Sequence, residues 1–277
     1  MNMIKSINDV ATLKNGVKMP YLGLGVWQVE NGNEIITAIK AAVNAGYRSI
    51  DTAAAYGNEE GVGKAIKECG IDRKELFITT KLWNSSQGYD SALKAFEESR
   101  RKLGLEYVDL YLIHWPVKGK YKESWKAIEK IYGDGLARAI GVCNFHIHHL
   151  DDLLKDAKIA PMVNQVEFHP LLAQKELREY CKARGIQFEA WSPLMQGHLD
   201  IPVLAELGNK YIKSPAQIVL RWDLQNEVIT IPKSTHEKRI IENAGIFDFI
   251  LTDAEMRAIN ELNKNRRFGP DPDNFNF

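Results

Sequence analysis

Apolar residues gather in eight short runs that recur along the chain. Each run is nearly continuous and rich in β-branched or aromatic residues, which is typical of parallel strands buried on both faces. We therefore expect strands at residues 21–27, 47–53, 76–83, 108–115, 136–145, 162–168, 186–194 and 228–234.

Between these runs the apolar positions change to spacings of three and four residues, as in amphipathic helices. In residues 33–46, Asn33 is expected to cap the helix and Gly46 to end it in a left-handed conformation. The same pattern predicts helices at residues 91–104, 176–185 and 254–263, and a helix start in the glycine-containing stretch 57–63.

Alternating strands and helices imply parallel pairing through right-handed crossovers, and eight such units in roughly 250 residues predict a closed (β/α)8 TIM barrel. A turn at Asn15-Gly16 adds a short N-terminal β-hairpin, and the final residues predict an irregular C-terminal tail, either a lid or a free end. No composition break divides the chain, so residues 1–277 are expected to form a single barrel domain.

An open doubly wound sheet is the alternative fold. When it binds a dinucleotide, it normally carries G-x-G-x-x-G after its first strand. The two partial matches, which begin at Gly23 and Gly61, end in Gln28 and Ile66. The barrel is therefore favoured.

Composition narrows the class of protein. The chain has 277 residues, with 36 Lys and Arg balanced by 36 Asp and Glu. This balance, and the lack of an apolar run of roughly 18 residues, predict neither a nucleic-acid nor a membrane partner. Three separated cysteines without a CxxC pair indicate a reduced, cytoplasmic protein.

Polar residues at the ends of adjacent expected strands supply candidate chemistry. Asp51 and Tyr56 follow the second strand, Lys81 ends the third and His114 ends the fourth. Each has an ordinary alternative, such as a helix cap, a solvated strand end or a core histidine. Active sites of TIM barrels lie at this end, so their convergence favours a catalytic cluster.

The ordered motifs "SIDTAAAYGNEEGVG", "TTKLWNS", "YLIHWP", "GVCNF", "NQVEFHP", "WSPL" and "IPKSTHEKRIIEN" resemble those of the aldo-keto reductases. The resemblance implies an NADPH-dependent carbonyl reductase, usually monomeric, with Asp51, Tyr56, Lys81 and His114 as its catalytic residues. The "GPDPDNFNF" ending is similar to that of bacterial members acting on small aldehydes, methylglyoxal-type dicarbonyls or keto sugars.

Elementary chemistry is consistent with these roles. A phenol titrates near ~10, and a nearby cation lowers that pKa, so Lys81 could activate Tyr56 as the acid. Asp51 would hold Lys81 in place, and His114 would orient the carbonyl oxygen of the substrate.

The cofactor needs another anchor because the glycine fingerprint is missing. Lys233 and Ser234 precede a helix that contains Arg239, and such groups suit the 2′-phosphate of NADPH. The resemblance implies cofactor contacts at Gly25, Val26, Trp27, Asn144, Gln165, Trp191, Ser192, Pro193, Leu194, Lys233, Ser234, Thr235, Arg239, Glu242 and Asn243. Trp27, Trp83 and Trp115 are expected to line the pocket of a small-molecule carbonyl substrate, whereas Trp125 and Trp222 are expected to pack between elements.

Two other functions remain as alternatives. A metal-dependent hydrolase could use His114, His169 and Asp51, and a cofactor-binding regulatory module could use the same fold without catalysis.

The stretch "FHIHHL" suggests a metal site at His146, His148 and His149. It lacks a matching carboxylate or cysteine set in the sequence, so no metal is expected. The resemblance makes Glu167 and His169 structural.

Overall fold

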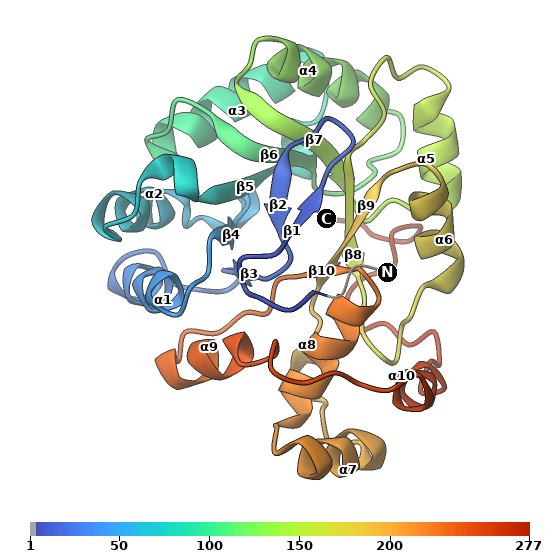
Figure 1. Cartoon of the computed structure of the whole chain (residues 1–277). Coiled ribbons are helices and arrows are strands. Elements are labelled where there is room, and N and C mark those ends of the chain that lie inside the picture. Colours follow the sequence, from blue (N-terminus) through green and yellow to red (C-terminus); the bar gives the residue numbers. More distant parts are fainter. Residues whose placement is uncertain (1–3) are drawn as a thin grey trace.

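The computed structural model describes residues 4–277, and its centre is a ring of eight parallel strands surrounded by helices (Figure 1). The strands are β3 (Gly23–Gly25), β4 (Ser49–Asp51), β5 (Phe77–Leu82), β6 (Val108–Ile113), β7 (Ala137–Cys143), β8 (Val163–Glu167), β9 (Gln187–Trp191) and β10 (Ile229–Thr230). Each pairs with the next, and bridges from Leu22 to Thr230 and from Gly25 to Lys233 close the ring. The predicted (β/α)8 barrel is confirmed; residues 1–3 of the expected domain lie outside the described part.

The first and last strands of the barrel are shorter than their apolar runs, with three and two residues. At Gly25 the backbones approach so closely that a Cβ would lie 2.8 Å from the carbonyl oxygen of Ile231. The Gly25 N–H donates instead to the carbonyl of Pro232 at 3.2 Å. Both apolar runs continue past the hydrogen-bonded strand as loops that line a cavity. The length of an apolar run therefore overestimates the length of its strand.

Ten α-helices lie in the described part of the chain. They are α1 (Asn33–Asn44), α2 (Glu59–Glu68), α3 (Tyr89–Leu103), α4 (Tyr121–Gly133), α5 (Ile147–Leu154), α6 (Lys175–Ala183), α7 (Pro202–Tyr211), α8 (Pro215–Gln225), α9 (Glu237–Ala244) and α10 (Asp253–Asn260). The predicted cap of α1 was wrong by one residue, because Gly32 occupies that position. Gly46 does adopt a left-handed conformation, with φ of 97°. No helix in residues 4–277 is long and apolar enough to span a membrane.

Two glycines of α2 allow close helix packing. A Cβ on Gly63 would lie 2.2 Å from the carbonyl oxygen of Leu103 in α3, and one on Gly61 would lie 2.5 Å from Ile35 Cγ2 in α1. The glycines of this partial motif therefore allow helix backbones to pack closely.

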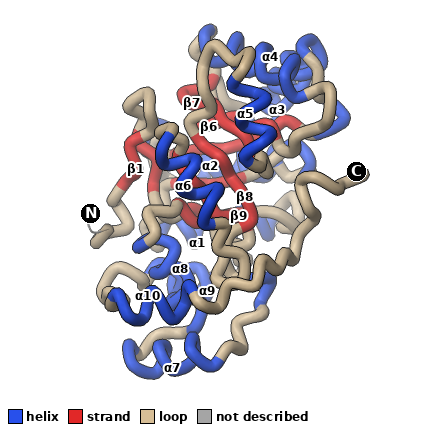
Figure 2. Tube along the Cα trace, turned by 90° about the vertical axis from the view of Figure 1, so that its right-hand side faces the viewer, coloured by secondary structure: helices blue, strands red, loops and turns tan. Residues whose placement is uncertain are grey.

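The two ends of the chain cover opposite ends of the barrel. The predicted hairpin forms from β1 (Val10–Thr12) and β2 (Lys18–Pro20), and Asn15 donates to the Arg138 carbonyl near the start of β7 at 2.9 Å. After α10 the chain continues without helix or strand past β8 and β9 (Figure 2). The backbone N–H groups of Phe268 and Gly269 donate to Glu167, the last residue of β8, at 2.6 and 3.2 Å. The tail is thus an ordered strap across the end of the barrel where the strands finish.

Candidate active site

A cavity of about 1310 Å³ opens at the carboxyl ends of the strands. Its walls include Asp51, Tyr56, His114 and Trp191 from the strand ends, together with part of the C-terminal tail. A volume above the usual range for small-ligand pockets, about 300–1,000 Å³, suits an extended ligand together with a second small molecule.

Lys81 lies directly behind the cavity wall and has no solvent exposure. Its Nζ donates to Asp51 Oδ1 at 2.5 Å, to the carbonyl of Thr52 at 3.0 Å and to the Tyr56 hydroxyl at 3.3 Å. Burial acts to lower the pKa of Lys81, but the opposing charge of Asp51 prevails and raises it. Lys81 is therefore a cation with all three donors engaged.

Tyr56 reaches Lys81 because a short 3-10 turn, Ala54–Tyr56, follows β4. Its side chain is partly exposed to the cavity. Removal of its hydroxyl from water raises the pKa of Tyr56 to about 12, and the charge of Lys81 only partly offsets this. Lys81 does lower this pKa, as expected from the sequence, but burial outweighs its effect. The hydroxyl is protonated at neutral pH and can donate.

His114 forms the neighbouring part of the wall. Its ring packs edge-on against Tyr56 and Trp83, with centroids 5.7 and 5.1 Å apart. Burial, helped by the charge of Lys81, holds the pKa of His114 well below its usual value, so the imidazole is neutral. Its Nδ1 is buried without a partner in residues 4–277. A neutral ring with unused hydrogen-bonding capacity fits a polar ligand group.

Beneath this cluster, polar side chains connect adjacent strands. Gln165 Nε2 donates to Asp51 Oδ2 at 2.8 Å and to Glu189 Oε2 at 3.0 Å. Burial and the charge of Asp51 raise the pKa of Glu189 to about 8. Sequence reasoning missed Glu189, although its place inside an apolar strand was a usable signal.

Asn144 links the catalytic candidates to Trp191. Its Nδ2 donates to the carbonyl of His114 at 3.0 Å and contacts Cys143 Sγ at 3.2 Å, and its Oδ1 accepts from Trp191 Nε1 at 2.8 Å. Burial raises the pKa of Cys143 well above the ordinary value, so its sulfur remains a thiol.

Several cavity residues have a left-handed backbone. Gln28, Asn144, Ser192 and Gln196 have φ values of 56°, 65°, 52° and 52° and all line the cavity. Such conformations cost about 1–3 kcal/mol each outside glycine and tend to gather at ligand sites. Three of these four residues, the two glutamines and the serine, are of types that rarely adopt this conformation, so the sequence alone does not predict it.

The far end of the cavity is lined by six of the residues expected to contact the cofactor: Lys233, Ser234, Thr235, Arg239, Glu242 and Asn243. Lys233 and Arg239 are exposed, and neither pairs with a carboxylate within the described part of the chain. Ser234 is buried, and its hydroxyl accepts the backbone N–H of His236 at 3.1 Å. Two unpaired cations beside the first turn of α9 form a suitable site for a phosphate.

The other expected cofactor residues line the cavity with one exception. Its wall also includes Gly25, Trp27, Gln165, Pro193 and Leu194, in addition to Asn144, Trp191 and Ser192 described above. The exception is Val26, which is fully buried and does not reach the cavity surface. Its N–H donates to the carbonyl of Asp51 and its carbonyl accepts from Asn58, so it supports the wall from behind.

Tail residues complete the wall, which sequence reasoning could not specify. The ring of Phe277 stacks on Trp83 at 5.8 Å and meets Trp115 edge-on at 5.2 Å. A Cβ on Gly269 would lie 2.3 Å from the ring of Trp191. Other lining residues that were missed are Gln28, Ala55, Gln196, Gly197, Leu199, Ser214, Pro215, Ala216, His236, Phe268 and Pro270.

The predicted packing tryptophans and the hydrolase hypothesis are also tested by the structure. Trp125 in α4 and Trp222 in α8 are buried, as expected.

The three residues of the hydrolase hypothesis do not all come together. His169 is hydrogen-bonded to Glu167 at 3.1 Å. Among residues 4–277 the hydrolase trio of His114, His169 and Asp51 does not form a group of neighbouring ligand atoms. The geometry therefore does not support a metal-dependent hydrolase.

Comparisons with known proteins find relatives along nearly the whole chain. Glyoxal reductase of Bacillus subtilis is 62% identical to this chain over 276 residues, covering 99% of the chain and 100% of the relative. Methylglyoxal reductase DkgA of Escherichia coli is 49% identical over 271 residues, covering 96% and 98% respectively.

Solved structures show the same fold. The aldo-keto reductase MGS-M4 from a Medee basin deep-sea metagenome library aligns with a TM-score of 0.94 at 44% identity, covering 96% of this chain and 100% of the other. A mutant of Gox0644 in complex with NADPH aligns with a TM-score of 0.91 at 44% identity, covering 97% and 98%. The sequence model of the Aldo/keto reductase family matches residues 21–264. With its strand-end cluster and its cavity, the chain therefore belongs to the aldo/keto reductase family and is an oxidoreductase.

Proposed function

We propose that this enzyme reduces small aldehydes and dicarbonyl compounds to alcohols, with NADPH as the hydride donor and Tyr56 as the proton donor. The observation that carries the proposal is the contact of buried Lys81 with both Asp51 and the Tyr56 hydroxyl beside a large cavity. The names of the two relatives, a glyoxal reductase and a methylglyoxal reductase, support dicarbonyls ahead of keto sugars.

The residues present fit NADPH. Lys233, Ser234 and Arg239 would hold its 2′-phosphate, because two of them are unpaired cations at the far end of the cavity. Trp191 and the amides of Asn144 and Gln165 would meet the nicotinamide end. When bound, the cofactor supplies the hydride. The loop of Ser192, Pro193 and Leu194 would cover the connecting phosphates.

The chain's own residues hold and donate the proton that the reduction needs. Tyr56 holds it at its hydroxyl, and Lys81, 3.3 Å away, stabilises the negative charge that develops as the proton leaves. Asp51 fixes the position of the ammonium. His114 donates a hydrogen bond to the carbonyl oxygen and sets its orientation toward Tyr56. Trp27, Trp83, Trp115 and Phe277 provide apolar walls that exclude water.

An NADPH oxidation assay with glyoxal, methylglyoxal, simple aldehydes and keto sugars tests the proposal, with NADH measured in parallel. We expect turnover with the dicarbonyls, with a higher kcat/KM for NADPH than for NADH. Tight NADPH binding without oxidation by any carbonyl compound would contradict it and would favour a regulatory module.

We further infer that the enzyme acts as a cytoplasmic monomer. The three cysteines are all free, and positive and negative charges balance along the sequence. Light scattering of the purified chain would test the oligomeric state, with a mass near 31.4 kDa expected.

A further inference from the structure

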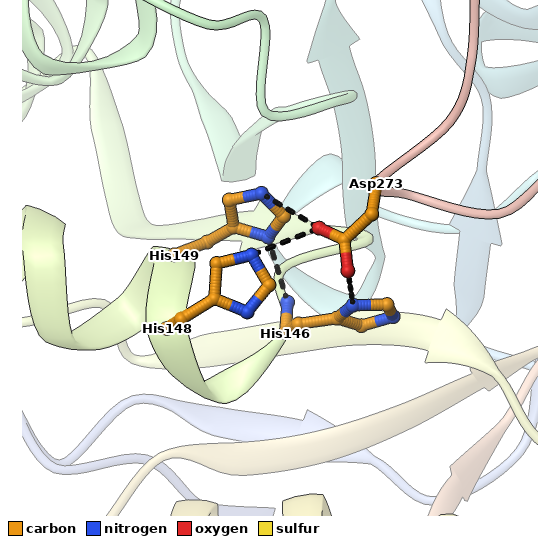
Figure 3. A group of neighbouring side chains, drawn as sticks. All are labelled: His146, His148, His149 and Asp273. Carbon is orange, nitrogen blue, oxygen red and sulfur yellow. Dashed lines mark hydrogen bonds and ion pairs between the residues drawn. The ribbon is translucent and has the colours of Figure 1, made fainter.

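Three histidines beside the start of α5 gather around one aspartate of the C-terminal tail, outside the residues that line the cavity (Figure 3). His146 Nδ1 lies 2.9 Å from Asp273 Oδ2, while His148 Nε2 and His149 Nε2 lie 2.8 and 3.3 Å from Asp273 Oδ1. The sequence offered no matching carboxylate or cysteine set for these histidines. The fold supplies one carboxylate, from 127 positions beyond His146.

We propose that His146, His148, His149 and Asp273 form a binding site for a divalent transition metal of the zinc type. One ligand atom from each residue lies within 4.8 Å of all the others. Imidazole nitrogen and carboxylate oxygen are usual zinc ligands at about 2.0–2.1 Å, and tetrahedral geometry then places ligand atoms about 3.3 Å apart. The separations of His148 Nε2 and His149 Nε2 from Asp273 Oδ1, 2.8 and 3.3 Å, are already close to that spacing. The rings of His148 and His149, with centroids 4.0 Å apart, must move apart before both can bind one tetrahedral ion.

The present hydrogen bonds show what the ion must replace. His149 Nδ1 accepts the backbone N–H of His146 at 3.2 Å, and His146 Nε2 accepts from Arg267 Nη2 at 2.9 Å. Both rings therefore carry their proton on the nitrogen that faces Asp273. Metal binding moves each proton to the other nitrogen and breaks these two bonds.

Arg267 has other partners available when it leaves His146. Its guanidinium lies 3.8 Å from a Glu167 oxygen and 3.9 Å from an Asp271 oxygen. His148 is the least restrained ligand, since its side chain is 62% exposed and only Asp273 contacts it through a polar atom. We therefore expect His148 and Asp273 to capture the ion, with His146 and His149 completing its coordination.

The site would join α5 to the tail that covers the cavity. Asp273 comes two residues before Phe275, whose ring lies 5.1 Å from Trp115, and four before Phe277, which stacks on Trp83. A metal ion at Asp273 would thus restrain the segment that forms the aromatic wall of the cavity. This part of the inference extends the proposed function, whereas metal binding itself does not depend on it.

Calorimetric titration of the metal-free full chain with ZnCl2 tests the site. We expect one ion per chain, with His148→Gln and Asp273→Asn each weakening binding at least about tenfold. His198→Gln is the matched control, because it removes an exposed histidine outside the cluster, and its affinity should equal that of the wild type. Arg267→Gln should bind more tightly, since it removes a nearby cation and its amide oxygen can accept the relocated His146 proton.

Absorption spectra with Co²⁺ and hydrogen exchange with Zn²⁺ provide readouts independent of activity. We expect weak visible bands of nitrogen and oxygen ligands without an intense thiolate band, which excludes binding at Cys69. Zn²⁺ should slow amide exchange in residues 266–277 of the wild type and leave the Asp273→Asn variant unchanged. Three results would overturn the proposed metal site. They are wild-type Zn²⁺ affinity in both His148→Gln and Asp273→Asn, an intense thiolate band with Co²⁺, and Zn²⁺ binding that does not reach one ion per chain. If amide exchange in residues 266–277 is unchanged while Zn²⁺ is bound, the inference that the ion restrains the tail is wrong.

Discussion

The ammonium of Lys81 lies 2.5 Å from the carboxylate of Asp51, and the two side chains are only 0% and 2% exposed. The pair belongs to the structural core as well as to the candidate active site. Removing one partner of a buried ion pair typically costs about 3–5 kcal/mol, because the other charge is left uncompensated. A single substitution here therefore confounds stability with catalysis.

The double variant Asp51→Asn/Lys81→Met separates these two roles. We expect Lys81→Met alone to lower the free energy of unfolding by about 3–5 kcal/mol. The double variant should recover most of that stability but keep reduction at least ~100-fold below wild type, since the charge that stabilises the Tyr56 phenolate is gone. Urea unfolding and steady-state kinetics measure both quantities. Turnover that recovers together with stability would show that the pair is only structural.

The Tyr56 hydroxyl should titrate above the ordinary tyrosine value. Burial raises its pKa to about 12, so in the cofactor-free protein the hydroxyl stays protonated as the pH rises through 10. The difference in phenolate absorbance between wild type and Tyr56→Phe, followed during an alkaline titration, isolates this group. Phenolate that appears below pH 10, the ordinary tyrosine pKa, would show that the charge of Lys81 outweighs burial.

Charge reversal should distinguish the two nicotinamide cofactors. Lys233→Glu or Arg239→Glu is expected to raise the KM for NADPH by about tenfold or more, because a charge-assisted contact with phosphate is replaced by repulsion. The KM for NADH should change far less. Lys238→Glu supplies the matched control, since this lysine also belongs to α9 but does not line the cavity. Equal effects on both cofactors would refute a role in binding the 2′-phosphate.

Substitution of Gly63 tests the close packing of α2. We expect Gly63→Ala to destabilise the fold by more than ~1 kcal/mol, because the new Cβ would lie 2.2 Å from the Leu103 carbonyl oxygen and the helices must separate. Gly133→Ala is the control: nothing lies within 4 Å of its Cβ position, and alanine should be neutral or stabilising there. Thermal unfolding of both variants provides the comparison, and equal melting temperatures would contradict the packing account.

The repeated strand–helix pattern and the gathering of Asp51, Lys81 and His114 were predictable because both follow from local sequence and the barrel fold. Period and apolarity located all eight strands, and Asp51, Lys81 and His114 follow from their positions at strand ends. The strand boundaries were less predictable, as β10 shows: its apolar run continues into the cavity wall at Ile231 and Pro232.

Features that depend on long-range contacts were not predictable. The tail has no hydrophobic period, so nothing local indicated that Phe277 would stack on Trp83 or that Asp273 would meet three histidines. The effect of Lys81 on the pKa of Tyr56 was expected, but the larger, opposite effect of burial was not, because a residue list does not show the desolvation of the hydroxyl. The left-handed backbone at Ser192 likewise reflects tertiary constraints rather than residue preference.

The rate of a single turnover by Tyr56→Phe tests the central claim most directly. The substitution removes only the proposed proton donor, so NADPH affinity, measured by fluorescence titration, should stay within a few fold of wild type. NADPH oxidation by methylglyoxal in the preformed enzyme–NADPH complex should then be nearly abolished, falling at least ~100-fold. A wild-type rate of oxidation in this variant, with the cofactor bound normally, would contradict the assignment of Tyr56 as the acid.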